Sequence, residues 1–150
     1  MKLISKTCNV YFWLAFMKNL GGSISGKQFN LFTDLVNLNL SFNSFSKKFP
    51  VGIFNLTSLR SLDISRNNFW GQFPNGVSNF QNLVVLDAFS NNFFGPLPTD
   101  VSQIPTLKSA QFSWKLLQRT NSIRVWFIPE PWVHTFSRKI SQWSQTTWTG

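Results

Sequence analysis

Apolar residues recur along the middle of this chain with a fixed period. Three segments, which begin at Leu35, Leu59 and Leu83, align without gaps at an offset of 24 residues each time. Each segment opens with the pattern L-x-x-L-x-apolar, after which an asparagine, a phenylalanine and a proline follow at constant spacing. Two apolar residues separated by one other residue point to the same face of a β-strand. The pattern therefore predicts one short strand in each 24-residue unit.

The repeated positions form five columns of equivalent residues. They are Leu38, Leu62 and Leu86; Leu40, Ile64 and Ala88; Asn43, Asn67 and Asn91; Phe45, Phe69 and Phe93; and Pro50, Pro74 and Pro98. A unit of this length cannot bury its apolar face alone, so successive units must stack with their strands in parallel. An asparagine amide both donates and accepts hydrogen bonds, which suits the free backbone groups of a turn. The phenylalanines are expected to stack as a spine inside the coils.

This spacing is the signature of leucine-rich repeats. We predict a repeat solenoid with one short parallel β-strand per 24-residue coil and an irregular convex side. The strands are expected near residues 37–41, 61–65 and 85–89.

Glycine follows the spine phenylalanine by two residues in the second and third coils. Gly71 and Gly95 suit a turn that needs a positive φ, whereas the first coil has Lys47 at this position. If Lys47 adopts the same conformation, it costs about 1 kcal/mol. An earlier partial coil is indicated by "NLGGSIS", residues 19–25, at a spacing of 25 residues.

The chain divides into three expected parts. They are a leader over 1–17, the solenoid over 18–108, and a basic, tryptophan-rich tail over 109–150. The apolar run of the leader, Val10–Met17, has eight residues and is too short to span a bilayer, which needs about 20. It is either a poor signal peptide or an irregular lead into the first coil.

Charge and candidate chemistry exclude several classes of function. The net charge is +9, yet residues 30–108 carry five basic and four acidic groups, so the repeats present no basic stripe for nucleic acid. Cys8 is the single cysteine, which rules out an internal disulfide and a cysteine-based metal site. His134 is the single histidine and has no nucleophile beside it. We predict no enzyme activity, no metal and no cofactor.

The segment "LTSLRSLDISRNNFWGQFPNGVSNFQNLVVLDAFSNNFFGPLP" resembles the plant-type leucine-rich repeat, L-x-x-L-x-L-x-x-N-x-L-x-G-x-[IL]-P. This is the ectodomain repeat of plant receptor-like kinases and receptor-like proteins. The resemblance covers about residues 18–108. The sequence of this region is similar to that of a subgroup that includes the vascular TDIF receptor and the More Lateral Growth protein.

The resemblance implies an extracellular or plasma-membrane-associated solenoid that recognises a secreted peptide, a receptor or a co-receptor. It also implies a membrane span, a Ser/Thr kinase domain and a paired-cysteine cap, none of which this sequence contains. We therefore expect a receptor ectodomain fragment that does not signal alone. The alternatives are a stand-alone interaction protein of the receptor-like-protein or inhibitor type, and a gene product without function.

Strand geometry selects the candidate ligand-facing residues, because side chains between the buried leucines point away from the core. They are Asn37, Asn39, Ser41, Ser61, Asp63, Ser65, Arg66, Val85, Asp87 and Phe89. Asp63 and Asp87 could meet a basic side chain, and Arg66 could meet a carboxylate. Asn39 and Asn55 begin N-glycosylation sequons, of which Asn55 is the better placed.

The tail holds five of the seven tryptophans of the chain. Tryptophan has a single codon, and a shift of one nucleotide turns each tail tryptophan that precedes another residue into glycine. With permitted codon choices, residues 110–126 become "LNLAGSYFRGPIPSEYG" and residues 127–143 become "SFQNLGFIHLAGKFLSG". Both match the repeat. A membrane-binding tail is the alternative, but this segment has no sustained amphipathic period.

We therefore predict that residues 109–150 are an out-of-frame continuation of the repeats, largely disordered or arbitrarily packed and without a site of their own. A genetic lesion, a splice choice and a sequencing error all remain open as its origin. Resequencing the locus beyond codon 108 should show a shifted frame that encodes further leucine repeats. Stop codons in that frame within about two repeat lengths would contradict the prediction.

Overall fold

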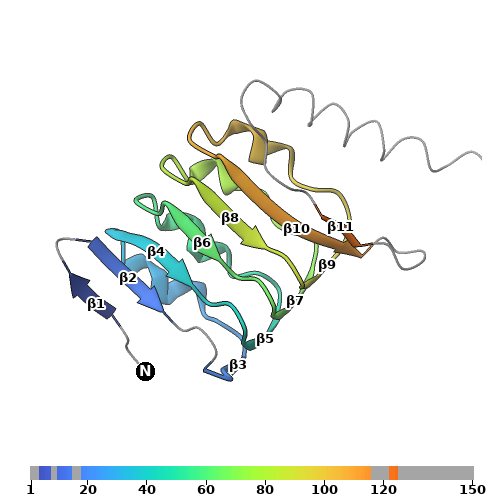
Figure 1. Ribbon diagram of the computed structural model, residues 1–150, viewed down its shortest axis with the longest axis horizontal. Coiled ribbons are helices and arrows are strands. Elements are labelled where there is room, and N and C mark those ends of the chain that lie inside the picture. The colour runs from blue at the N-terminus through green and yellow to red at the C-terminus, as the bar shows by residue number, and fades with distance from the viewer. Residues whose placement is uncertain (1–3, 8–9, 15–17, 116–121, 125–150) are drawn as a thin grey trace, which may run out of the picture.

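A computed structural model describes residues 4–7, 10–14, 18–115 and 122–124, which form two sheets and a row of 3-10 helices (Figure 1). The main sheet has the order β1(Ile4–Thr7), β2(Val10–Leu14), β4(Leu35–Asn39), β6(Ser61–Asp63), β8(Val85–Ala88), β10(Ser109–Lys115) and β11(Ser122–Arg124). The lateral sheet has the order β3(Gly21–Gly22), β5(Ser44–Lys47), β7(Asn68–Gly71) and β9(Asn92–Phe93). The 3-10 helices are η1(Gly26–Leu31), η2(Val51–Asn55), η3(Val77–Asn79) and η4(Thr99–Gln103).

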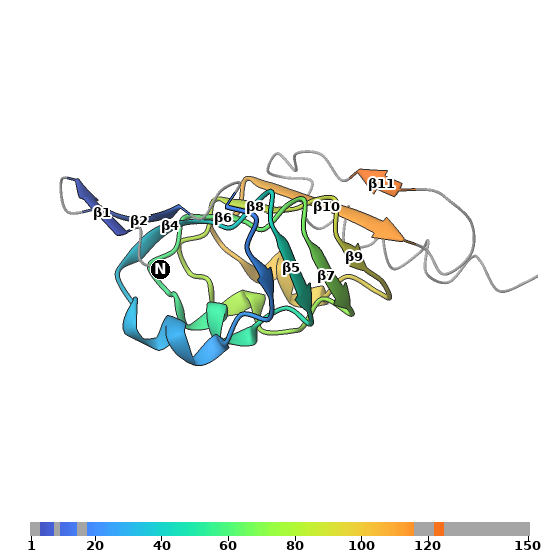
Figure 2. The same ribbon diagram turned by 90° about the horizontal axis from the view of Figure 1, so that it is seen from below.

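Each complete coil runs from the main sheet to the lateral sheet and then to a 3-10 helix. Figure 2 shows the main sheet on one side, the 3-10 helices on the opposite side, and β5, β7 and β9 along one flank. From β2 to β10 the strands of the main sheet pair in parallel, as do those of the lateral sheet. The predicted leucine-rich-repeat solenoid is confirmed.

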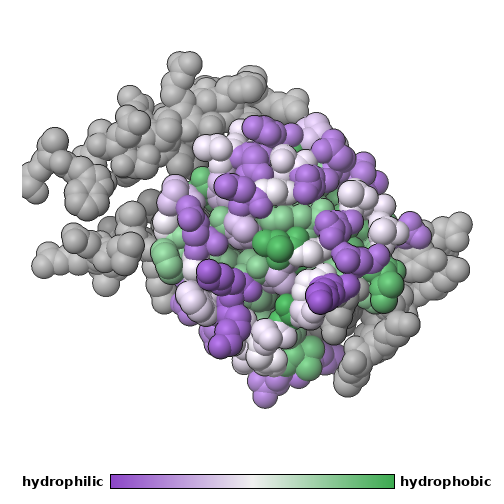
Figure 3. Space-filling model, turned by 180° about the vertical axis from the view of Figure 1, so that it is seen from behind, coloured by the Kyte–Doolittle hydropathy of each residue, from purple (hydrophilic) through white to green (hydrophobic). Residues whose placement is uncertain are grey.

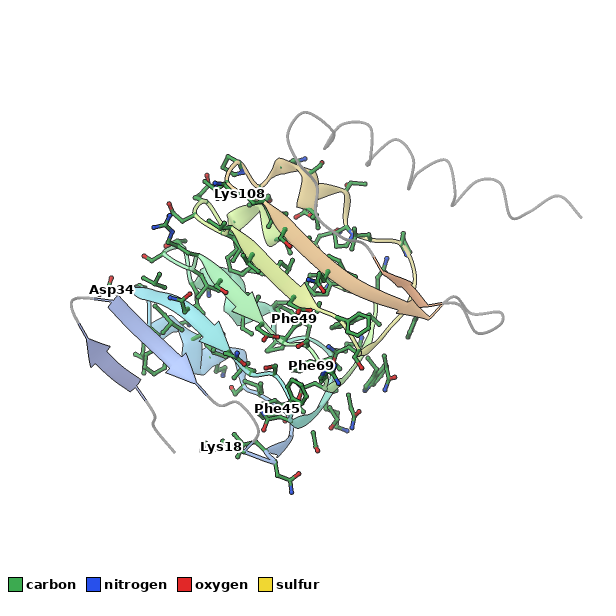
Figure 4. All side chains as sticks on the ribbon, viewed as in Figure 1. Lys18, Asp34, Phe45, Phe49, Phe69 and Lys108 are labelled. Carbon is green, nitrogen blue, oxygen red and sulfur yellow. The ribbon has the colours of Figure 1, made fainter. Side chains whose placement is uncertain are left out.

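The core consists of the repeated columns. Leu38, Leu62 and Leu86 lie opposite one another in the main sheet and are buried. The phenylalanine spine is also confirmed: ring centroids lie 6.2 Å apart for Phe45 and Phe69, and 6.4 Å apart for Phe69 and Phe93. Both pairs are stacked, and Figure 4 shows Phe45 and Phe69 in adjacent coils. Each coil thus fills the space that its neighbour leaves open.

The strands end earlier than the sequence predicted. Strand β4 ends at Asn39 and β6 at Asp63, because the chain turns into the left-handed region three residues later. The residues with positive φ are Phe42, Arg66 and Ser90, with φ of 54°, 53° and 56°. None is glycine, so residue type alone does not signal the turn.

The main sheet extends past both expected boundaries of the solenoid. Strand β2, within the expected leader, pairs in parallel with β4, and β10 pairs in parallel with β8. Residues 109–112 therefore add one parallel strand beyond the expected end of the solenoid. Ala110 and Phe112 are buried, and the Phe112 ring packs edge-on against Phe73 at 5.3 Å.

The apolar side chains of Ala110 and Phe112 explain why β10 joins the main sheet. Phe112 lies opposite the small Ala88, so a large ring fills the space beside a small side chain. The rest of the tail over 116–121 and 125–150, including His134, lies outside the described residues, as does Cys8. The out-of-frame origin of the tail stays a prediction.

The second residue after the spine position, which is Leu20 in the partial coil and phenylalanine in the three complete coils, has a positive φ. The angle is 84° at Gly22, 78° at Lys47, 98° at Gly71 and 83° at Gly95. The conformation expected for Lys47 is confirmed. A lysine at such an angle is strained because its Cβ crowds the following carbonyl oxygen.

Lys47→Gly should therefore raise the free energy of unfolding by roughly 1 kcal/mol, through relief of this strain. Urea denaturation followed by circular dichroism measures the change. Ser46→Gly is the matched control, because it places glycine at the neighbouring strand position without a positive φ and should destabilise the protein. Equal destabilisation by both substitutions would contradict the assigned strain.

Candidate functional site: the outer face of the main sheet

The outer face of the main sheet is built by the residues that alternate with the buried leucines. In β6, Leu62 is buried, whereas Ser61 and Asp63 are half-buried and point outward. Parallel pairing places equivalent residues opposite one another, so they form rows across the coils. We call this surface the strand face, and its central row consists of Asn39, Asp63, Asp87 and Gln111.

The central row is held by hydrogen bonds between coils and within turns. Asn39 Nδ2 donates to Asp63 Oδ2 at 3.3 Å. In each of these two coils, the row residue also accepts from the serine two residues later. Asn39 Oδ1 accepts from the Ser41 backbone N–H at 2.9 Å and its hydroxyl at 2.7 Å. Asp63 Oδ1 accepts the same two bonds from Ser65, at 3.0 and 2.7 Å.

The expectation that Ser41 and Ser65 face a ligand is wrong. Their exposed fractions are 1% and 6%, and their hydroxyls are used by the row residues of their own coils. The early end of each strand causes this, because the following turn rotates the serine inward. These two side chains orient Asn39 and Asp63 instead of contacting a ligand.

Asp87 has a different environment from the equivalent residues of the earlier coils. The residue two positions later is Phe89, whose backbone N–H donates to Asp87 Oδ1 at 2.9 Å but which has no hydroxyl to add a second bond. Burial raises the pKa of the Asp87 carboxyl, and the neighbouring Asp63 carboxylate raises it further. The Phe89 hydrogen bond and the Arg66 charge act against this and lower the pKa, but the net shift is upward.

Arg66 lies at the end of the second coil's strand, in the left-handed turn. Its guanidinium carbon is 4.6 Å from the centroid of the Phe42 ring, which gives a cation–π contact between neighbouring coils. Arg66 remains exposed, and Phe42 is partly exposed beside it. Phe42 was not among the predicted site residues, although its register with Arg66 was visible in the sequence.

The remaining predicted residues lie on the strand face. Asn37 and Ser61 are half-buried and in register, next to the more exposed Val85. The sequence missed Ser109 and Gln111, which extend the rows of Val85 and Asp87 into β10. The 24-residue offset could have identified both.

The two sequons occupy different settings. Both polar atoms of the Asn39 side chain make hydrogen bonds, Nδ2 to Asp63 and Oδ1 to Ser41. Asn55 is exposed at the end of η2, where its Nδ2 donates to Asn30 Oδ1 at 2.8 Å. This geometry favours Asn55 as the acceptor, and glycosylation stays a prediction at both positions.

Other kinds of site find no support in the part of the chain that the structure describes. Within those residues, no group of three or more His, Cys, Asp or Glu side chains gathers as a metal site. None of the helices described there has the length and apolarity needed to cross a membrane. The opposite side of the molecule, over the 3-10 helices, mixes hydrophilic and hydrophobic residues (Figure 3).

Asp87→Asn should stabilise the folded protein at neutral pH. A raised pKa means that folding disfavours the ionised carboxyl, so the cost is absent below the ordinary pKa range of aspartate and appears as pH rises through the raised value. An asparagine is compatible with this position because Asn39 occupies the equivalent position two coils earlier. The gain should stay within the roughly 1 kcal/mol typical of partly exposed charges.

Urea denaturation at neutral and at acidic pH tests this, and the gain should disappear in acid. Asp34→Asn removes the same charge from an exposed position ahead of β4, away from the central row (Figure 4), and controls for net charge. A gain that persists in acid, or that Asp34→Asn reproduces, would argue against the burial of the Asp87 carboxyl beside Asp63 as its cause.

Sequence comparison identifies the repeats directly. The Leucine Rich Repeat family matches residues 34–56 and 58–80. A search of curated protein sequences finds no match to this chain.

Solved structures with a similar fold include plant receptors and a plant ice-binding protein, which is 28% identical over 70% of this chain. A TDR receptor is 46% identical over 63% of this chain, with a TM-score of 0.60. The ectodomain of the Arabidopsis thaliana membrane receptor kinase GASSHO1/SCHENGEN3, solved in complex with CASPARIAN STRIP INTEGRITY FACTOR 2, is 29% identical over 64% of this chain, with a TM-score of 0.61. The ectodomain of the Arabidopsis thaliana receptor kinase SOBIR1 is 28% identical over 71%, with a TM-score of 0.62.

The chain spans only part of each of these structures: 17% of the TDR receptor, 12% of GASSHO1/SCHENGEN3 and 58% of SOBIR1. The likeness therefore concerns a stack of coils and not a whole receptor. Residues 34–56 and 58–80 are leucine-rich repeats, and the described solenoid has the fold of a plant leucine-rich-repeat receptor kinase ectodomain.

Proposed function

We propose that the strand face recognises a secreted peptide or a segment of a partner receptor, outside the cell or at the plasma membrane. The observation that carries the proposal is the pair of neighbouring carboxylates, Asp63 and Asp87, in the centre of an otherwise uncharged row. A basic side chain placed over this pair would be attracted by both. The chain takes part in binding and has no catalytic role in this proposal.

The energetics of the pair support a binding role. Asp87 is half-buried beside a like charge, so its ionised form costs folding free energy. The equivalent position in the first coil is Asn39, which shows that the fold accepts a neutral side chain there. Groups that a fold does not require and that cost stability are typical of functional surfaces. A bound guanidinium or ammonium group would remove the repulsion.

The rows also indicate how a peptide would lie. Neighbouring strands are separated by about 4.8 Å, so a peptide that crosses the strands meets a new coil every one or two residues. Beside the carboxylate pair, the exposed Val85 and the half-buried Phe89 offer apolar contact. Arg66 stands at the end of the strand face, where it can bind a peptide carboxylate.

Charge reversal tests the proposal. Short synthetic peptides that carry no, one or two arginines should bind the wild-type chain in that order of increasing affinity. Replacement of Asp63 and Asp87 by lysine should weaken binding of the two-arginine peptide by about 1–3 kcal/mol, the scale of hydrogen bonds to charged groups. Isothermal titration calorimetry measures both series.

Asp34→Lys is the matched control, since it adds positive charge outside the strand face and should leave the affinity nearly unchanged. Thermal melting establishes that each variant is folded. Recognition by the carboxylate pair would be refuted if the affinity did not depend on the number of arginines in the peptide. It would also be refuted if Asp34→Lys lowered the affinity as much as the replacements on the strand face.

A further inference from the structure

A second surface lies on the lateral sheet, away from the strand face. Trp70 lies in β7 and Phe94 directly follows β9, in adjacent coils. Their side chains are 45% and 39% exposed. Figure 2 shows β5, β7 and β9 along one flank of the molecule. The Phe94 backbone N–H donates to the Gly71 carbonyl at 3.0 Å, so the two coils are joined directly at this place. We call Lys48, Trp70, Gln72 and Phe94 the lateral patch.

The repeat itself shows that folding does not require these aromatic rings. The residues equivalent to Trp70 and Phe94 differ between coils, and the first coil has Ser46 at this position. The neighbouring spine positions, by contrast, are phenylalanine in all three coils and are buried. Two large apolar side chains therefore stand in solvent where the same fold accepts a serine, which marks them as candidates for contact with a partner.

Basic and amide side chains border the two rings. A Cβ atom added to Gly71 would lie 3.6 Å from Lys48 Cγ. The aliphatic part of the lysine side chain therefore lies against Gly71, the residue that follows Trp70. In the same way, Gln72 lies beside Gly95, which follows Phe94. Lys47 and Lys48 are both exposed.

The charge of this flank has one sign. Lys18 extends it toward β3, where Figure 4 places its side chain. The acidic residues in the described part of the chain all belong to other places: Asp34 precedes β4, and Asp63, Asp87 and Asp100 lie in β6, β8 and η4. The lateral patch is therefore apolar in its centre and positive at its edge.

We propose that the lateral patch is a docking surface for an acidic protein segment that carries apolar side chains, separate from the strand face. Tryptophan and phenylalanine supply the apolar contact, and the lysines select an acidic partner. The stacked strands below hold the rings on a fixed framework, which lowers the entropy lost on binding. The proposal does not depend on the function proposed for the strand face, because the two surfaces lie on different sheets.

Selection from a phage-displayed library of random peptides on the immobilised chain tests the proposal. The selected peptides should combine Asp or Glu with aromatic or aliphatic residues. Binding of the corresponding synthetic peptide should weaken by roughly tenfold or more in Trp70→Ser, as expected for a central aromatic contact. The serine copies the residue of the first coil, which favours retention of the fold.

Two further variants separate the possible outcomes. Lys48→Glu should also weaken binding of the peptide, and the difference in affinity from the wild-type chain should become smaller at high salt. Asp63→Asn with Asp87→Asn, on the strand face, should leave the affinity unchanged. If Trp70→Ser does not melt cooperatively, Lys48→Glu decides, because its side chain is exposed.

Three results would overturn the proposal. They are the recovery of no acidic peptide, an unchanged affinity in a folded Trp70→Ser or Lys48→Glu variant, and binding of an acidic polysaccharide such as polygalacturonate without any peptide binding.

Discussion

The asparagine at the end of each strand joins one coil to the next, and the solenoid depends on this contact. Asn67 Nδ2 donates to the carbonyls of Leu40, in the preceding coil, and Ile64, in its own coil, while its Oδ1 accepts from the Phe45 backbone N–H. Asn91 repeats the arrangement one coil later with Ile64 and Phe69. The amide is buried, so each bond that it makes satisfies a backbone group that water cannot reach.

The strand face and the lateral patch both follow from the geometry that these asparagines fix. The asparagines hold the strand ends at the same position in each coil. Every second residue of a main-sheet strand therefore joins a row of outward side chains across the coils, and the lateral sheet forms similar rows on the flank. Side chains in these rows are free to vary because the buried columns carry the folding energy. Asp63 and Trp70 lie seven positions apart in one coil, yet they belong to different faces.

The sequence predicted the columns because the same residue types recur at the same spacing in three coils. The sequence could not predict that Ser41 and Ser65 point inward. The turn that follows each strand has a positive φ at a residue other than glycine, so no glycine marks its place in the sequence. The sequence also missed β10, where Ala110 and Phe112 stand at the buried positions and Phe112 lies opposite the small Ala88. The exposure of Trp70 was hidden because that position is variable in the pattern.

The bonds of Asn67 to the preceding coil end on main-chain atoms, which are the same whatever side chains a coil carries. A coil inserted, deleted or exchanged as a whole would therefore find the same partners above and below it. In evolutionary terms, unequal recombination between such units can lengthen or shorten the array without compensating changes in the neighbours, provided that the exchange preserves whole coils. Recognition can then diverge coil by coil while the interface between coils stays constant.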